Sequence, residues 1–146
     1  MDALNRLRNH IADVPSRVVL RSAAELTKKM RGKWSRKEIL GHLIDSAVNN
    51  LKRFTDAQFA DGPYPIQPYR QDELVRVNHY QELPLAHLLT LWQSLNTQIL
   101  YVAEATPAEA LAQPVHINTS DVKEYTLGWL IEDYVAHLEH HLKTLL

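Results

Sequence analysis

The chain has 146 residues, no cysteine, eight histidines and a formal net charge of −1 from 16 basic and 17 acidic residues. Without cysteine it forms no disulfide, thiolate zinc site or iron–sulfur cluster, so any transition-metal site must use histidine with carboxylates or water. The near-neutral charge argues against a broad nucleic-acid interface, which needs a basic surplus. The length suits one domain, which we expect to span residues 1–146.

Few glycines and one cluster of prolines favour an all-α fold over a sandwich or barrel. Apolar residues at helical spacing predict a first helix over about 2–21, kinked or interrupted at Pro15. A second helix begins after Ser35, which forms a capping box with Glu38, and it runs to about Phe59. The elements predicted for the rest of the chain are an extended loop at 61–68, a short helix at 72–77, a third long helix from near Pro84, a short turn after Thr106 and Pro107, an irregular or weakly extended stretch at 113–125, and a fourth long helix from near Thr126 to the end.

Four long amphipathic helices predict an antiparallel four-helix bundle with a long connection between its second and third helices. This connection exceeds what compact helix pairs need, so we expect it to form part of a binding surface. The sequence has no apolar run long enough for a membrane span and no apolar signal core behind its first basic residues. We therefore expect a cytoplasmic protein that has neither membrane nor nucleic acid as a partner.

Helix geometry separates the eight histidines. His137 and His141 lie four residues apart on the apolar side of the fourth helix, a spacing at which two imidazoles reach one metal ion. His42 lies at the edge of the buried face of the second helix. If the second and fourth helices pack antiparallel, His42 lies at about the same position along the bundle axis as His137 and His141. Glu139 points elsewhere and does not directly follow His137, so the pattern is not the H-E-x-x-H motif of metalloproteases. The alternative is that these histidines are hydrogen-bonded packing residues. We interpret the other five as ordinary residues, namely His10, His79, His87, His116 and His140.

Three short motifs follow one another along the chain: Lys33-Trp34-Ser35, then His42-Leu43-Ile44-Asp45, then the pair His137 and His141. In this combination and order they resemble the DinB-like superfamily, and in particular its YfiT-type branch of metal-dependent hydrolases. The resemblance extends over nearly the whole chain. It implies an up-down-down-up four-helix bundle, a homodimer, and one divalent metal ion per chain, nickel or zinc, held by His42, His137 and His141.

Members of this superfamily include thiol-dependent S-transferases, so the resemblance also implies a small-molecule substrate, with a low-molecular-weight thiol as one candidate. A divalent ion held by three neutral imidazoles has open positions and lowers the pKa of a thiol or water bound there, which suits an S-transferase or a hydrolase. The absence of cysteine is no obstacle, because a co-substrate would supply the thiol. The alternative is a non-catalytic helical dimer or ligand-binding module of the same fold, because a fold does not determine a function.

Further candidate site residues lie on or near the second helix. Asp45 is a candidate hydrogen-bond partner for a metal-ligating histidine, because such histidines usually donate their second N–H to a carboxylate, carbonyl or water. Asn49, Arg53 and Tyr69 are candidates for the mouth of a substrate pocket, where Arg53 would meet a carboxylate. The alternative for the helix residues is a solvated edge with modest ion pairs.

Overall fold

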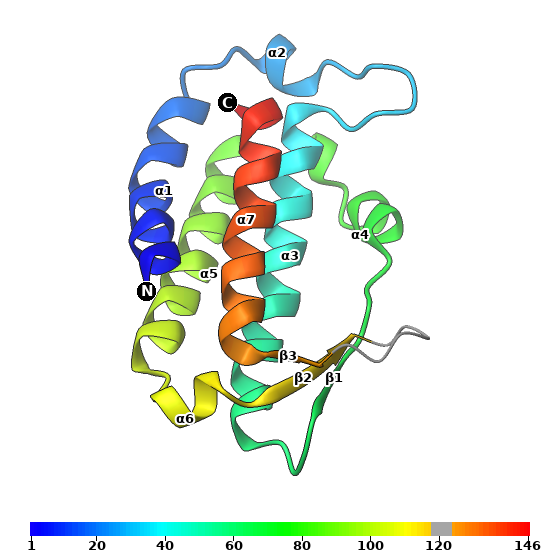
Figure 1. Ribbon diagram of the computed structural model, residues 1–146. Helices are drawn as coiled ribbons and strands as arrows, with labels where there is room; N and C mark the ends of the chain where they lie inside the picture. Colours follow the sequence, from blue (N-terminus) through cyan, green and yellow to red (C-terminus); the bar gives the residue numbers. More distant parts are fainter. Residues whose placement is uncertain (118–123) are drawn as a thin grey trace.

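The computed structural model describes residues 1–117 and 124–146. Its four long helices are α1 (Asp2–Val18), α3 (Arg36–Asp56), α5 (Leu85–Ala105) and α7 (Leu127–Leu145). Both α1 and α3 pack against α5 and α7, so each helix has two neighbours around a shared core. Figure 1 shows α1 and α7 running in one direction and α3 and α5 in the other. The predicted all-α fold, a four-helix bundle, is confirmed, and its helices run up, down, down and up.

Shorter elements connect the long helices at both ends of the bundle. In chain order they are α2 (Ala23–Thr27), η1 (Ala57–Phe59), β1 (Tyr64–Ile66), α4 (Gln71–Val77), η2 (Tyr80–Glu82), α6 (Ala108–Leu111), β2 (Pro114–Ile117) and β3 (Glu124–Thr126). The strands form one small sheet in the order β1-β2-β3. In this sheet β1 pairs with β2 in parallel, with Tyr64 opposite Val115, and β2 pairs with β3 antiparallel, with Val115 opposite Tyr125. The sheet lies at the end of the bundle where α7 begins (Figure 1).

Side-chain caps fix where the helices begin. The Ser35 hydroxyl accepts from the Glu38 backbone N–H, and the Glu38 carboxylate accepts from the Ser35 N–H, both at 3.1 Å. This capping box starts α3 as predicted. Ser22 and Glu25 form a second one, which starts the unpredicted helix α2. Thr126 caps α7 through its hydroxyl. The caps of Ser35 and Thr126 therefore fix the first turns of α3 and α7.

Pro15 lies inside α1 without interrupting it, and the helix continues to Val18. A proline has no N–H, so the carbonyl of Ile11 loses its normal helical donor. The Gln93 side chain of α5 donates to this carbonyl instead, at 3.1 Å. A neighbouring helix thus compensates for the missing donor, a tertiary contact that the sequence pattern of α1 alone does not show.

The core is apolar and is shared by all four long helices. Its largest fully buried side chains are Leu7, Leu40, Leu43, Ile44, Phe54, Leu88, Trp92, Ile99, Leu127, Ile131, Leu138 and Leu145. One buried polar pair connects α7 to α5, where the Tyr134 hydroxyl donates to Asn96 Oδ1 at 2.6 Å. No helix in the described part of the chain combines the length and apolar character that a membrane span requires.

The connection from α3 to α5 returns along the outside of α3, as Figure 1 shows for α4. At its end the Tyr80 ring packs directly on Gly41 of α3, where a Cβ atom would lie only 2.1 Å from Tyr80 Cδ2. The Tyr80 hydroxyl also donates to Asp45 Oδ1 at 2.5 Å. These contacts fix η2 on the turn of α3 that carries His42.

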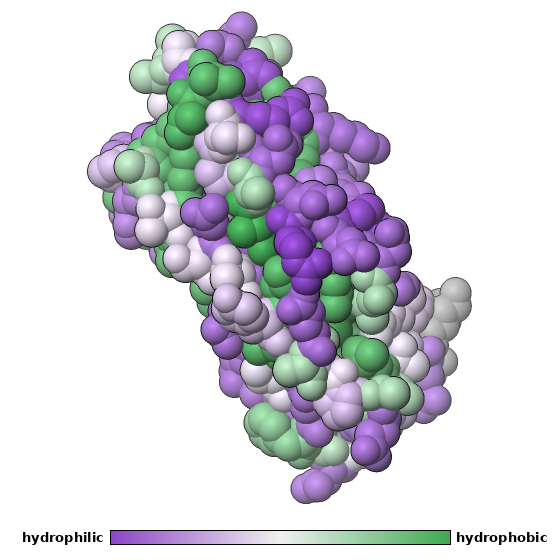
Figure 2. Space-filling model, turned by 90° about the vertical axis from the view of Figure 1, so that its left-hand side faces the viewer, coloured by the Kyte–Doolittle hydropathy of each residue, from purple (hydrophilic) through white to green (hydrophobic). Residues whose placement is uncertain are grey.

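The surface on the α1 side of the molecule is mixed in character. Figure 2 shows hydrophilic and hydrophobic residues interspersed there, without one dominant apolar area. Among the large apolar side chains of the described residues, Leu20 just beyond α1 and Phe59 at the end of η1 are the most exposed, at 83% and 74%.

Candidate metal centre

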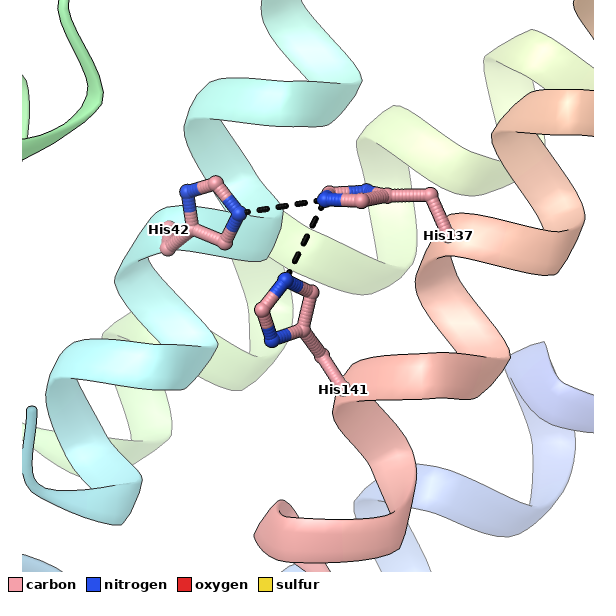
Figure 3. Close-up of side chains that lie close together, drawn as sticks. All are labelled: His42, His137 and His141. Atoms are coloured by element: carbon pink, nitrogen blue, oxygen red, sulfur yellow. Dashed lines mark hydrogen bonds between the residues drawn. The ribbon is translucent and has the colours of Figure 1, made fainter.

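Three histidines from two antiparallel helices meet inside the bundle. His42 lies in the second turn of α3, and His137 and His141 lie one turn apart on α7. His137 Nε2 is 3.4 Å from His42 Nε2 and 3.2 Å from His141 Nε2. Figure 3 shows the three rings pointing toward one another from the two helices. The structure therefore brings together the three residues that the sequence singles out.

The spacing of the three nitrogens fits a metal ion. Each histidine offers one ring nitrogen, and these atoms all lie within 4.8 Å of one another. With metal–nitrogen distances of about 2.0–2.1 Å, two tetrahedral ligands are about 3.3 Å apart. The two Nε2 separations that involve His137, 3.2 and 3.4 Å, match this value. A donor set of three imidazoles suits zinc, nickel and similar divalent ions.

The surroundings keep these imidazoles in the neutral form that binds metals. His42 is fully buried, and burial together with the neighbouring His141 and His137 lowers its pKa to about 4. The pKa of His141 is also lowered to about 4, by burial and then by His137 and His140. Burial and then His140 lower the pKa of His137. Near neutral pH the three rings are uncharged and hold their lone pairs ready for a cation.

The Trp34 ring, which comes from the loop between α2 and α3, packs beside the site. The Trp34 ring lies 4.7 Å from the His42 ring, centroid to centroid. His42 Nδ1 is buried and has no partner among the described residues. His140, interpreted from the sequence as an ordinary residue, has its ring 5.2 Å from that of His141 and is exposed.

A cavity of about 550 Å³ opens beside His137. It lies between α3 and α7, and the connection after β1 adds Pro68, Tyr69 and Gln71 to its wall. This agrees with the expectation that the long connection contributes to a binding surface. The cavity volume is in the range of small-molecule sites.

Two of the candidate pocket residues, Arg53 and Tyr69, line this cavity. Arg53 is half-buried, and its guanidinium lies 5.3 Å from the centroid of the Tyr69 ring, a cation–π contact. Arg53 donates to Asn50 Oδ1 at 3.3 Å and also to the Gln67 carbonyl. Burial lowers the pKa of Arg53.

The other two candidates, Asp45 and Asn49, do not line the cavity. Asp45 is 5% exposed, faces η2, and accepts from Tyr80; burial raises its pKa, although the Tyr80 hydroxyl opposes this. Its Oδ2 is buried without a partner among the described residues. The side-chain amide of Asn49 donates to the Asp45 backbone carbonyl at 2.8 Å. Within residues 1–117 and 124–146, neither residue forms a hydrogen bond with a histidine of the site.

Several other side chains also line the cavity. Ser46 and Asn50 form its wall on α3, and Asp133 and His140 form part of its wall on α7. Ser46 and Asn50 follow His42 at intervals of four residues, which places them on the same side of α3. Burial raises the pKa of Asp133.

Comparisons with known structures agree with the fold. The structure is similar to that of YfiT from Bacillus subtilis, described as a probable metal-dependent hydrolase with an unusual four-helix bundle topology, with a TM-score of 0.84 and 20% identity over 96% of this chain and 79% of YfiT. It is also similar to a mycothiol-dependent maleylpyruvate isomerase, with a TM-score of 0.70 and 16% identity over 97% of this chain and 58% of the isomerase. At these identities the likeness concerns the fold.

No curated protein sequence matches the chain. The sequence model of the DinB superfamily matches residues 4–145, which is nearly the whole chain. The match includes both helices that carry the three histidines. The chain therefore belongs to the DinB superfamily.

Proposed function

We propose that His42, His137 and His141 bind one divalent metal ion per chain, nickel or zinc, and that the protein is a metal-dependent enzyme acting on a small molecule. The observation that carries this proposal is the convergence of three Nε2 atoms, with separations of 3.2 and 3.4 Å, from two helices. Burial keeps the three rings neutral, so the cluster has the charge state that a cation requires.

The reaction class follows from this donor set and from the composition of the chain. A divalent ion with three imidazole ligands supplies Lewis acidity and lowers the pKa of a bound thiol or water. Because the chain contains no cysteine, any reactive sulfur must come from a substrate. We therefore propose an S-transferase that uses a low-molecular-weight thiol, or a hydrolase.

Residues around the histidines have supporting roles in this proposal. Trp34 covers His42 and limits the access of water to it. Asp45, held by Tyr80, fixes the turn of α3 that carries His42. Arg53 and Tyr69 line the cavity in which the substrate binds. Asn49 supports this wall only through its hydrogen bond to the α3 backbone.

The similar structures support metal dependence and the use of a thiol, since one is described as a probable metal-dependent hydrolase and the other as a mycothiol-dependent isomerase. The homodimeric state and cytoplasmic location expected from the sequence are part of the same proposal. Size-exclusion chromatography with light scattering tests the first, and cell fractionation tests the second.

Activity assays on metal-loaded protein test the proposed reaction. A panel of low-molecular-weight thiols is mixed with 1-chloro-2,4-dinitrobenzene, and hydrolysis of p-nitrophenyl acetate is followed in parallel. We expect a metal-dependent rate in one of the two assays, lost in His137→Ala. The matched control is His87→Ala, because His87 is exposed on α5, outside the site and its cavity. If no metal-dependent rate is found with any substrate, the non-catalytic module is the better account.

A further inference from the structure

The cavity beside His137 forms a groove along the contact between α3 and α7. Its wall on α3 consists of Ser46, Asn50 and Arg53, which continue the column that begins at His42. These positions are four, eight and eleven residues after His42, which keeps them on one face of the helix. The groove therefore has His137, one of the three clustered histidines, at one end and Arg53 at the other.

The position of Arg53 sets a length along this groove. Its Cα is eleven residues from His42, about 16 Å along the helix axis. Because its Nη1 donates to Asn50 Oδ1, the guanidinium leans back along α3 toward the histidines. Asn50 is eight residues from His42, so the guanidinium lies about 12 Å from the level of His42.

The charge of Arg53 is not neutralised by the protein. No Asp or Glu of residues 1–117 or 124–146 lies within 4.0 Å of its guanidinium nitrogens, and its two hydrogen-bond acceptors are neutral. An arginine side chain has five N–H donors, so these two contacts leave three free. A half-buried cation without a counter-ion is unfavourable, and an anion that enters the groove relieves this cost.

The opposite wall limits which anion fits. Asp133 lies on α7 one turn before His137 and lines the same cavity. Its carboxylate repels a doubly charged group such as a phosphate more strongly than a single carboxylate. The groove is therefore better matched to a ligand with one carboxylate directed at Arg53.

We propose that Arg53 is a specificity-determining residue that binds the carboxylate of an elongated substrate, whose reacting group lies at the three histidines about 12 Å away. This inference rests on the proposed metal-dependent function and adds a substrate class to it. The substrate is a small molecule with a thiol, or a hydrolysable group, at one end and a carboxylate at the other.

Binding of simple mercapto acids to the cobalt-loaded protein tests this inference without requiring turnover. The probes are 3-mercaptopropanoate, 8-mercaptooctanoate and the neutral 8-mercaptooctanamide. Binding is followed by the sulfur-to-cobalt charge-transfer absorption band. We expect 8-mercaptooctanoate to bind about tenfold more tightly than its amide, since a charge-assisted contact is formed. 3-Mercaptopropanoate is too short to reach Arg53, so we expect it to bind no more tightly than the neutral amide.

Variants separate a contact with the ligand from a structural role. Arg53→Gln should weaken binding of 8-mercaptooctanoate about tenfold and leave the amide unchanged. Arg70→Gln is the matched control, because it removes an equal charge from an arginine whose side chain is 85% exposed outside the groove. Arg53→Gln that weakens acid and amide alike would show that Arg53 only supports the loop, and would overturn the inference.

The remaining outcomes are also decisive. Equal binding of all three thiols would leave the proposed function standing and overturn the substrate class inferred here. If none of the thiols binds the cobalt-loaded protein, the thiol-dependent function fails, and the inference about thiol substrates fails with it.

Discussion

Gly41 lies on α3 beside His42, and the Tyr80 ring of η2 packs against it. A Cβ atom at residue 41 would lie 2.1 Å from Tyr80 Cδ2 and 2.2 Å from Cγ, closer than real contacts allow. Gly41→Ala must therefore displace the Tyr80 ring, which is 5% exposed and donates its hydroxyl to Asp45. The substitution tests whether the long connection is fixed to α3 at this point.

The expected magnitude combines two losses and one gain. Loss of a hydroxyl bond to a carboxylate costs about 1.5–3 kcal/mol, and partial exposure of an aromatic ring costs a similar amount. Alanine gains about 1 kcal/mol over glycine inside a helix. We therefore expect Gly41→Ala to lower the free energy of unfolding by about 3 kcal/mol, and the Tm by about 10 °C for a chain of this size.

Urea and thermal unfolding, followed by circular dichroism, measure this change. The informative comparison is Gly41→Ala in a Tyr80→Gly background, which also removes the Tyr80 Cβ that would lie 2.7 Å from the new methyl group. In that background the added methyl should be neutral or should stabilise by up to about 1 kcal/mol. If Gly41→Ala destabilises both backgrounds equally, contact with Tyr80 is not the cause and the reasoning is refuted.

Three further predictions concern stability. Because the pKa of buried His42 is lowered from 6.5 to about 4, the unfolded chain binds a proton that the folded, metal-free chain does not. Stability should therefore fall as the pH drops from about 6.5 to about 4, by about 3 kcal/mol from this residue, and His42→Gln should flatten the dependence in urea titrations. Ser35→Ala removes the cap of α3 and should cost about 1 kcal/mol, measured by urea unfolding against Ser16→Ala, an exposed serine within α1, as a control. Tyr134→Phe leaves Asn96 Oδ1 buried without its hydroxyl donor and should cost about 1–3 kcal/mol; an unchanged Tm would contradict the importance of this pair.

The long helices were predictable because their signals are local and repeated. Apolar residues recur at helical spacing over many turns, and caps such as Ser35 and Thr126 mark the first turns of α3 and α7. The small sheet was not predictable in this way. Its strands have three or four residues, too few to show a period, and the parallel pairing of Tyr64 with Val115 joins segments far apart in the sequence.

In the candidate site, too, the residues fixed by local sequence patterns were predictable, and those fixed by distant contacts were not. The meeting of the three histidines follows from the spacing of His137 and His141 and from the helix levels, both readable in the sequence. The cavity wall was harder to predict, because Asn49 and Asn50 are adjacent and differ by about 100° around α3. Only the position of α7 and of the covering connection decides that Asn50, and not Asn49, lines the cavity.

Metal content is the most direct measure of the central claim. Elemental analysis of protein purified without a histidine tag should find one divalent ion per chain, and the same for the control His87→Ala. His42→Ala, His137→Ala and His141→Ala should each lose the ion while their circular dichroism still shows a folded bundle. Full metal content in a variant that lacks all three histidines would contradict the account.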